Sequence, residues 1–337
     1  MSCFEDKMLL TRTAIMEYRS LGNSGLEIST VALGCWPMAG MTSPGATDED
    51  SIATIRECFE LGINHLDTAF MYGAGGESER IIARAMEGRR EEIVLATKGG
   101  LHWDQQGKTR IADSRPATLR RQCEESLRRL DTDRVELYYL HAFDSSVPLA
   151  ETAGEMKRLM DEGKTRFVGV SNLTLDQMKE FTAHCPIVAY QPLYNMLQRQ
   201  IETDALPWCR ERDIAVLPYW VLYKGLLAGR LRREDVMPEG DSRRKYRMFH
   251  GEEWEKNHVF LDTLRQIADT AGHTVAQLVV NWTIHRPGIT SALCGAKRPD
   301  QIRETADAVG WRLTDEQQAE IERAIDERGE VDTSEVG

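Results

Sequence analysis

Three short apolar segments of this sequence each end at, or just before, a residue whose side chain can carry charge. These residues are Asp67, Lys98 and His141, and Tyr72 follows five residues after Asp67. In enzymes built on a barrel of parallel strands, catalytic groups come from the carboxyl ends of several strands. If the three segments are such strands, a carboxylate, an ammonium group, an imidazole and a phenol meet at one face of the molecule.

These four side chains suit the transfer of a proton to a carbonyl oxygen. Asp67 can pair with a buried Lys98. The Lys98 cation would stabilise the phenolate of Tyr72, and we expect it to lower the pKa of that phenol from about 10. Tyr72 could then donate a proton, and His141 could hold the substrate oxygen. No side chain donates hydride, so a nicotinamide cofactor is implied.

The elements that must position these groups alternate along the chain. Candidate strands are short, apolar and bounded by Gly, Pro or polar residues. They span 31–33, 63–67, 93–96, 135–140, 167–170, 187–191, 214–218 and 291–293. Candidate helices span 51–61, 78–86, 116–130, 150–162, 175–181, 203–212, 277–284 and 299–308, with a last one ending near 328. Capping boxes at Thr174 and Thr314 mark two helix starts.

Eight strands that alternate with helices predict an α/β fold, a (β/α)8 barrel of the TIM type. Residues 19–27 predict an N-terminal β-hairpin. Residues 1–15 precede the pattern as an extension, either disordered or a start-site extension, and residues 16–337 are expected to form a single barrel domain. The charge-rich connection 229–257 follows the seventh strand, and we expect either a lid over the site or a solvated excursion.

Composition excludes several classes of partner. The 337 residues carry 42 Lys and Arg against 54 Asp and Glu, a net charge of −12, which argues against nucleic acid or an anionic membrane surface. No apolar run is long enough to span a membrane. Seven scattered cysteines without paired spacing indicate reduced thiols in a cytoplasm and no metal site. Neither a dinucleotide-binding glycine motif after a strand nor a phosphate-binding loop occurs.

Several motifs resemble the aldo-keto reductase family over nearly the whole chain, from about residue 16 to 328. They are Gly62-Ile63-Asn64-His65-Leu66-Asp67-Thr68-Ala69-Phe70-Met71-Tyr72-Gly73, Thr97-Lys98, Leu140-His141, Gly169-Val170-Ser171-Asn172, Tyr190-Gln191-Pro192-Leu193-Tyr194-Asn195 and Gly225-Leu226-Leu227-Ala228-Gly229-Arg230. The segment Lys98-Gly99-Gly100-Leu101-His102-Trp103-Asp104 resembles a bacterial branch with Lys-x-Gly-Leu-x-Trp-Asp after the third strand.

The resemblance implies roles for named residues. Tyr72 would be the general acid and base, with Asp67, Lys98 and His141 completing a catalytic tetrad. For the cofactor it implies Ser171, Asn172 and Gln191 at the carboxamide, Tyr219 against the nicotinamide ring, Leu222, Lys224 and Gly225 along the pyrophosphate, Gly295, Lys297 and Arg298 at a 2′-phosphate, and Gln301 and Glu304 toward the adenosine. Two cations that open a helix favour a phosphate, so NADP is preferred to NAD.

The sequence departs from the family pattern at positions near the predicted site. Trp220 follows Tyr219 where relatives commonly have a small residue, so Trp220 is expected to reshape the substrate pocket or the cofactor's phosphate tunnel. Trp36, Trp103 and Phe143 are the other candidate walls of the substrate pocket, because aromatic walls with a few polar groups suit a carbonyl compound or a sugar.

Three functions follow from these residues. The first is an NADP-dependent oxidoreductase that reduces an aldehyde, ketone or sugar carbonyl, with Tyr72 as proton donor. The second is an NAD(P)-linked sugar or polyol dehydrogenase that works in the oxidative direction. The third, from a different class, is a redox-sensing regulatory subunit that holds the cofactor. The physiological substrate and the oligomeric state stay open at this point.

Overall fold

A curved sheet of parallel strands forms the centre of the computed structural model, which describes residues 15–40, 45–107 and 109–336. Its strands in these ranges are β3 (Val31–Gly34), β4 (His65–Asp67), β5 (Val94–Gly99), β8 (Val135–Leu140), β9 (Thr165–Ser171), β10 (Ala189–Gln191), β11 (Ala215–Val216) and β12 (Ala292–Gly295). Their order is β11-β10-β9-β8-β5-β4-β3-β12. The two end strands also meet, because the N–H of Leu293 donates to the carbonyl of Pro218 at 3.1 Å and that of Thr290 to Val216 at 2.9 Å.

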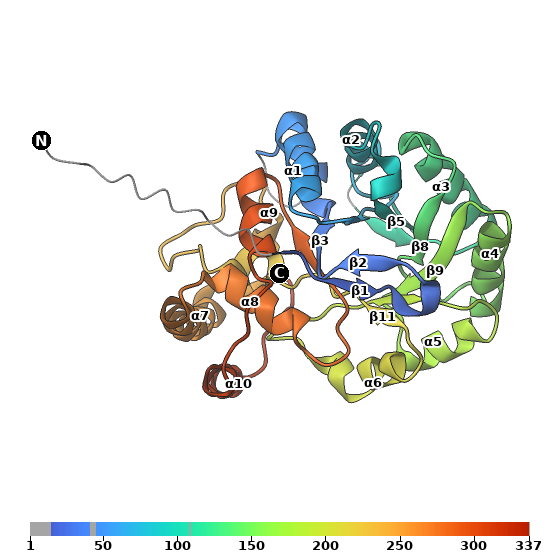
Figure 1. The fold of residues 1–337 in the computed structure, drawn as a ribbon. Helices are drawn as coiled ribbons and strands as arrows, with labels where there is room; N and C mark the ends of the chain where they lie inside the picture. The colour runs from blue at the N-terminus through green and yellow to red at the C-terminus, as the bar shows by residue number, and fades with distance from the viewer. Residues whose placement is uncertain (1–14, 41–44, 108, 337) are drawn as a thin grey trace, which may run out of the picture.

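Helices surround the strands, as Figure 1 shows. They are α1 (Asp48–Glu60), α2 (Glu77–Ala85), α3 (Pro116–Arg129), α4 (Leu149–Asp161), α5 (Leu175–Thr182), α6 (Ala205–Arg210), α7 (Gly251–Ala271), α8 (Val275–Ile284), α9 (Pro299–Ala306) and α10 (Asp315–Arg328). The capping boxes at Thr174 and Thr314 are present at the starts of α5 and α10. A membrane crossing would need a longer apolar helix than any in the described part of the chain. The predicted (β/α)8 barrel is confirmed.

The predicted hairpin closes one end of the barrel. β1 (Tyr18–Ser20) and β2 (Glu27–Ser29) pair antiparallel and cross the end of the ring of strands in Figure 1. Leu21 and Ile28 of the hairpin are fully buried. The predicted extension 1–15 lies outside the described residues except for residue 15.

Side chains along each strand alternate between the barrel interior and the helices. The inner cluster holds the interior-facing residues together with the hairpin: Leu21, Ile28, Ala32, Val94, Ala96, Leu137, Tyr139, Val188, Ala189, Ala215, Leu217 and Leu293. Gly169 belongs to this arrangement, since a Cβ there would lie 2.5 Å from Cε1 of Tyr139. The barrel interior is therefore packed with side chains rather than hollow.

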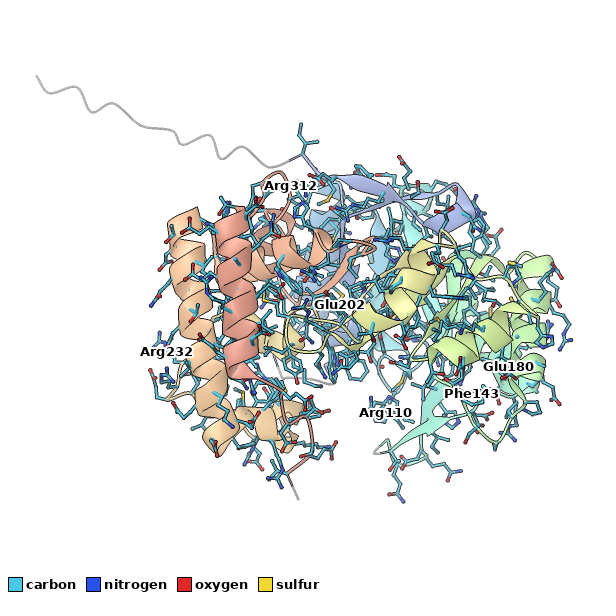
Figure 2. All side chains as sticks on the ribbon, turned by 90° about the horizontal axis from the view of Figure 1, so that it is seen from below. Arg110, Phe143, Glu180, Glu202, Arg232 and Arg312 are labelled. Carbon is cyan, nitrogen blue, oxygen red and sulfur yellow. The ribbon has the colours of Figure 1, made fainter. Side chains whose placement is uncertain are left out.

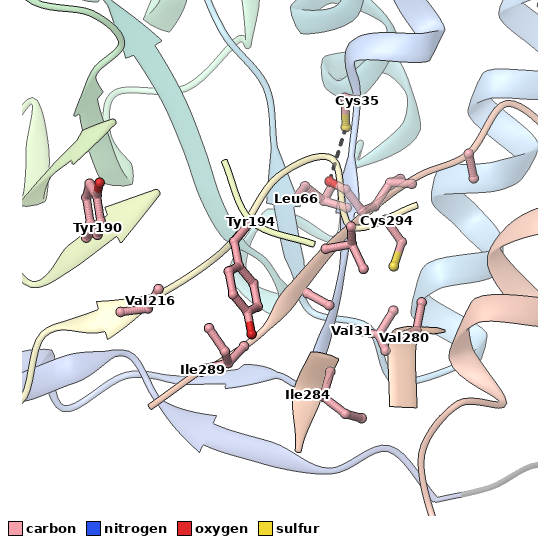
Figure 3. Close-up of a cluster of buried hydrophobic side chains, with 14 of the residues drawn as sticks. Val31, Cys35, Leu66, Tyr190, Tyr194, Val216, Val280, Ile284, Ile289 and Cys294 are labelled. Carbon is pink, nitrogen blue, oxygen red and sulfur yellow. Dashed lines mark hydrogen bonds between the residues drawn. The ribbon is translucent and has the colours of Figure 1, made fainter. Parts of the chain in front are cut away.

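A larger outer cluster lies between the strands and the helices. Figure 3 shows part of it, including Val31, Cys35, Leu66, Tyr190, Tyr194, Val216, Val280, Ile284, Ile289 and Cys294. Val31 and Leu66 point outward here, whereas their strand neighbours Ala32 and Asp67 point to the other side. This alternation decides which residues at the strand ends can meet.

The structure differs from the sequence expectations in two places. After β5 the chain forms an antiparallel hairpin, β6 (Leu101–Trp103) and β7 (Arg110–Ala112), which no prediction covered. The predicted connection 229–257 is shorter than expected, because its last seven residues belong to α7, which begins at Gly251. Between Gly229 and α7 the chain contains only short 3-10 helices, Ser242–Lys245 and Arg247–Phe249.

The C-terminal segment fixes this connection in place. Tyr246 and Glu335 form an antiparallel bridge. The N–H of Val336 donates to Lys245 at 2.7 Å, and the N–H of Arg247 donates to Ser334 at 3.0 Å. The last residues of the described chain therefore hold Tyr246 in position.

Candidate active site

The alternation of side chains along the strands brings Asp67, Lys98 and His141 together at one end of the barrel. On β5, Val94 and Ala96 belong to the inner cluster, and Lys98 lies two residues further along the same face. Asp67 ends β4 next to β5, and His141 directly follows β8. Because all strands are parallel, these residues gather at the carboxyl end of the barrel, here called the barrel mouth.

The ammonium group of Lys98 is completely buried and has three acceptors. It donates to Oδ1 of Asp67 at 2.5 Å, to the carbonyl of Thr68 at 2.8 Å and to the hydroxyl of Tyr72 at 3.2 Å. Three donors are all that an ammonium group has. Asp67 accepts a further hydrogen bond on Oδ2 from the amide of Gln191 at 2.8 Å. The group is thus fixed with its charge toward Tyr72.

Burial and charge act in opposite directions on Lys98 and Tyr72. Burial lowers the pKa of Lys98, but the attraction of Asp67 and Tyr72 and the hydrogen bonds to both outweigh it, so this pKa is raised. Burial raises the pKa of Tyr72 and outweighs the opposing attraction of Lys98. The expectation of a lowered pKa for Tyr72 is therefore wrong, because the loss of water around the phenolate destabilises it more than the Lys98 cation stabilises it. Tyr72 is protonated at neutral pH, as a proton donor must be.

His141 is a neutral imidazole beside Tyr72. Burial, with the charges of Lys98 and Arg110, holds its pKa well below the usual range. The rings of His141 and Tyr72 lie edge to face, 5.8 Å between centroids. Within the described residues Nδ1 of His141 is buried without a hydrogen-bond partner. This nitrogen is not accessible from the barrel mouth, but His141 as a whole is partly exposed, so the open edge of its ring can meet a bound polar group.

A chain of side-chain amides and hydroxyls lies beside His141. The amide of Asn172 donates to the carbonyl of His141 and to the hydroxyl of Ser171, both at 3.0 Å. Ser171 donates to the carbonyl of Gln191 at 2.8 Å, and Tyr219 donates to Oδ1 of Asn172 at 2.7 Å. Asn172 has a φ of 59°, which Asn tolerates better than most residues. The four residues predicted around the carboxamide and the nicotinamide ring are therefore neighbours.

The segment after β11 has unusual backbone geometry. Trp220, Tyr223 and Lys224 have φ values of 58°, 44° and 55°, and such strain is concentrated at functional sites. The Lys224 ammonium lies 3.9 Å from the ring centroid of Trp220 and 4.3 Å from that of Tyr246. Burial and the charge of Arg110 lower the pKa of Lys224 to about 8.

Further cations lie close to Lys224. Arg243 binds Asp241 with two donors at 2.9 and 2.6 Å, and Nη1 of Arg243 is 3.6 Å from where a Cβ on Gly225 would stand. Burial and the charge of Arg243 lower the pKa of Lys297. Arg243 was not among the predicted site residues, although it belongs to the basic run after the seventh strand, which was the available signal.

The remaining predicted cofactor residues lie at or near the junction of β12 and α9, and several already have protein partners. Arg298 pairs with Asp300 at 3.1 Å. Oε1 of Gln301 accepts from the N–H of Lys297 at 2.8 Å. Glu304 accepts from Arg230 at 2.5 Å. Gly295 ends β12 and is exposed, and Leu222, at the other predicted phosphate segment, accepts through its carbonyl from the N–H of Gly225 at 2.8 Å.

The three aromatic residues predicted to line the substrate pocket differ in how close they lie to Tyr72. The ring of Trp36 lies edge-on to Tyr72 with centroids 4.9 Å apart. The indole of Trp103 donates to the carbonyl of Met71 at 2.9 Å, which ties it to the residue before Tyr72. Phe143 is half-buried two residues after His141 and packs against the outer cluster. The described residues contain no cluster of His, Cys, Asp and Glu arranged to hold a metal ion.

A (β/α)8 barrel with polar side chains gathered at the strand ends is a barrel of the enzyme type. Residues 30–326 match the family model described as Aldo/keto reductase family, and the chain belongs to this family. The protein is therefore an oxidoreductase of a family that uses nicotinamide cofactors and acts on small molecules.

Curated relatives agree with this assignment. The chain is 36% identical over 314 residues to the aldo-keto reductase YhdN of Bacillus subtilis, covering 92% of this chain and 94% of the relative. It is 32% identical over 306 residues to probable aldo-keto reductase 1 of Glycine max, covering 90% and 88%.

Solved structures show the same fold. The glycerol dehydrogenase AKR11B4 from Gluconobacter oxydans aligns with a TM-score of 0.84 at 34% identity, covering 94% of this chain and 96% of that chain. The aldo-keto reductase AKR11C1 from Bacillus halodurans, in its holo form, aligns with a TM-score of 0.75 at 28% identity, covering 92% and 96%.

Proposed function

We propose that this protein is an NADP-dependent reductase of aldehyde, ketone or sugar carbonyls, with Tyr72 as the proton donor. The buried Lys98 ammonium, bound to both Asp67 and Tyr72, is the observation that carries the proposal. A phenol held next to a fixed cation can lose a proton during a reaction, because the cation stabilises the phenolate that remains. A nicotinamide cofactor, when bound, would supply the hydride.

Each residue of the tetrad has a separate task in this proposal. Neutral His141 binds the substrate's carbonyl oxygen, and Tyr72 donates its proton to that oxygen. Lys98 stabilises the resulting phenolate, and Asp67 holds Lys98 in place with the help of Gln191. The raised pKa of Tyr72 keeps the proton in place until the substrate oxygen becomes strongly basic as the hydride arrives.

The donor set near the barrel mouth suits a dinucleotide with phosphate groups. Ser171, Asn172 and Gln191, which lie together, would hold the carboxamide, and Tyr219, which binds Asn172, would lie beside the nicotinamide ring. Burial is the largest cause of the lowered pKa values of Lys224 and Lys297, and the crowding of positive charge around Arg243 adds to it. An anion would relieve this crowding. The remaining proposed cofactor contacts are Trp220, Leu222, Gly225, Gly295, Arg298, Gln301 and Glu304.

The role of Tyr72 is tested by Tyr72→Phe. We expect the loss of at least about 100-fold in kcat, the lower end of what a positioned proton donor contributes, with NADPH affinity unchanged. The measurement is NADPH oxidation at 340 nm with a panel of aldehydes, ketones and sugars. Full activity of this variant would refute the assignment of Tyr72 as proton donor.

The preference for NADP depends on Lys297. We expect Lys297→Ala to weaken NADPH binding about tenfold or more and to leave NADH binding unchanged, because only NADPH carries the 2′-phosphate that this cation would contact. Fluorescence titration of each cofactor measures this. Lys256→Ala, which removes an exposed cation of α7, is the control, and equal NADPH affinity in both variants would contradict the contact.

A second function is favoured by one comparison. The glycerol dehydrogenase from Gluconobacter oxydans is 34% identical over nearly the whole chain, so oxidation of a polyol or sugar is the alternative direction. Rates of glycerol oxidation with NADP and NAD, set beside rates of glyceraldehyde reduction, decide between the two. A cofactor-holding sensor would instead retain nucleotide through gel filtration and turn over very slowly.

We also propose a cytoplasmic location. The six cysteines among the described residues are all buried with free thiols, as expected in a reducing compartment.

A further inference from the structure

Arg110 stands at the barrel mouth on the hairpin that the sequence did not reveal. It begins β7 and lies directly opposite Trp103 of β6 in the antiparallel register. The indole of Trp103 is in turn bound to the carbonyl of Met71, next to Tyr72. Figure 2 labels Arg110 beside this hairpin. Arg110 is therefore connected to the loop that carries Tyr72 through a single residue, Trp103.

The charge of Arg110 reaches groups on the other sides of the barrel mouth. After burial, it contributes to the shifted pKa values of four residues around it. It lowers the pKa of His141 and of Lys224. It opposes the rise of pKa that burial causes in Tyr219 and Tyr246. Arg110 is therefore within electrostatic range of residues that follow β8 and β11.

The side chain of Arg110 is exposed. Among the described residues no ion pair or hydrogen bond involves its exposed guanidinium. The contrast with Arg115, on the same connection, is direct: Arg115 is held by Asp113 with donors at 2.8 and 2.5 Å. In a chain with a net charge of −12, a guanidinium left open at the barrel mouth creates a local site for an anion.

We infer that Arg110 binds a carboxylate at the far end of the carbonyl substrate, so that the preferred substrates are aldehydes or ketones that carry a second, anionic group. A planar guanidinium matches one carboxylate both in charge and in its two parallel donors. Trp36 lies edge-on to Tyr72, and Trp103 lies opposite Arg110 in the hairpin, so both indoles offer apolar surface to the carbon skeleton of such a substrate. This inference rests on the proposed function, because it assumes that the carbonyl oxygen is held at Tyr72 and His141.

The test compares two aldehydes of nearly equal shape, 4-carboxybenzaldehyde and the neutral 4-formylbenzamide. We expect Arg110→Met to lower kcat/KM for the carboxylate about 10- to 100-fold, as loss of a charged hydrogen bond does, mainly through KM, and to change the amide less than twofold. Arg110→Lys should recover part of the loss. Arg312→Met, an exposed cation at the opposite end of the molecule in Figure 2, is the control for net charge.

Binding without turnover separates this inference from the proposed function. Calorimetric titration with 4-(hydroxymethyl)benzoate and its amide, in the presence of NADPH, with which an alcohol cannot react, should show a preference for the benzoate that Arg110→Met removes. Loss of that preference in Arg110→Met supports the inference even if turnover is absent. Equal effects of Arg110→Met on both compounds, or no effect on either, would overturn it. Absence of turnover with both aldehydes in the wild-type protein would instead overturn the reductase proposal.

Discussion

Two ion pairs of this protein have nearly the same length and differ in burial. Lys98 and Asp67 are 2.5 Å apart with side chains 0% and 3% exposed. Arg84 and Asp48 are 2.6 Å apart with both side chains 55% exposed. We expect Lys98→Met to lower the free energy of unfolding by about 3–5 kcal/mol and Arg84→Met to lower it by less than about 1 kcal/mol.

The expected difference follows from what each substitution leaves behind. At 2.5 Å and an effective dielectric constant of about 20, the attraction in the buried pair is about 7 kcal/mol. Desolvation of the two ions offsets most of it, at several kcal/mol for each ion. Removal of Lys98 cancels the attraction but leaves the desolvation of Asp67, whose remaining side-chain partner is Gln191. Asp48 keeps its contact with water when Arg84 is removed.

A double variant sharpens the test. In Lys98→Met combined with Asp67→Asn no buried charge is left, so we expect the pair to be coupled by about 2–3 kcal/mol rather than additive. Urea unfolding at pH 7, followed by tryptophan fluorescence and far-ultraviolet circular dichroism, measures the stability of all variants. The reasoning is refuted if Lys98→Met and Arg84→Met differ by less than about 1 kcal/mol, or if the two buried substitutions add.

Two further predictions concern the cofactor loop and the barrel interior. Because the pKa of Lys224 is about 8, its positive charge is lost as pH rises through 8, and NADPH affinity should fall up to about tenfold between pH 8 and 9. Lys224→Met should bind weakly at every pH from 7 to 9, and a pH profile parallel to the wild type would contradict the role. Gly169→Ala should cost about 1–3 kcal/mol in urea unfolding, since its methyl group would overlap Tyr139. Gly154→Ala in α4, which meets nothing closer than 4.0 Å, should instead stabilise by about 0.5–1 kcal/mol, and similar losses in both would show that packing at Tyr139 is not the cause.

The strands of the barrel could be predicted because each is short, apolar and bounded by breakers. Helix α7 could not be separated from the charged connection before it, although Trp254, His258, Leu261 and Leu264 are buried at helical spacing. Their signal is diluted by many charged residues between them. The β6–β7 hairpin was missed for another reason: its six paired residues include His102 and Arg110, and only the pairing across the turn makes them strands.

The sequence could predict that the four tetrad residues lie together, because parallel strands bring their carboxyl ends to one face. The direction of the pKa shift of Tyr72 was not, since it depends on how much burial outweighs Lys98. Arg110 was also beyond the sequence, and Arg243 was visible only as one member of a basic run. The position of Arg110 is set by its pairing with Trp103 across a hairpin, and the connection that carries Arg243 is fixed by the C-terminal segment, which pairs with Tyr246.

The hairpin that seals the amino-terminal end gives the barrel a single entrance. Leu21 and Ile28 fill that end and pack against the interior side chains. Ligands can therefore reach Tyr72 only through the barrel mouth. A molecule seated deeper in that entrance cannot leave before one bound above it. The ligand that binds last must therefore leave first. This predicts an ordered kinetic mechanism, with product inhibition by the ligand that occupies the entrance.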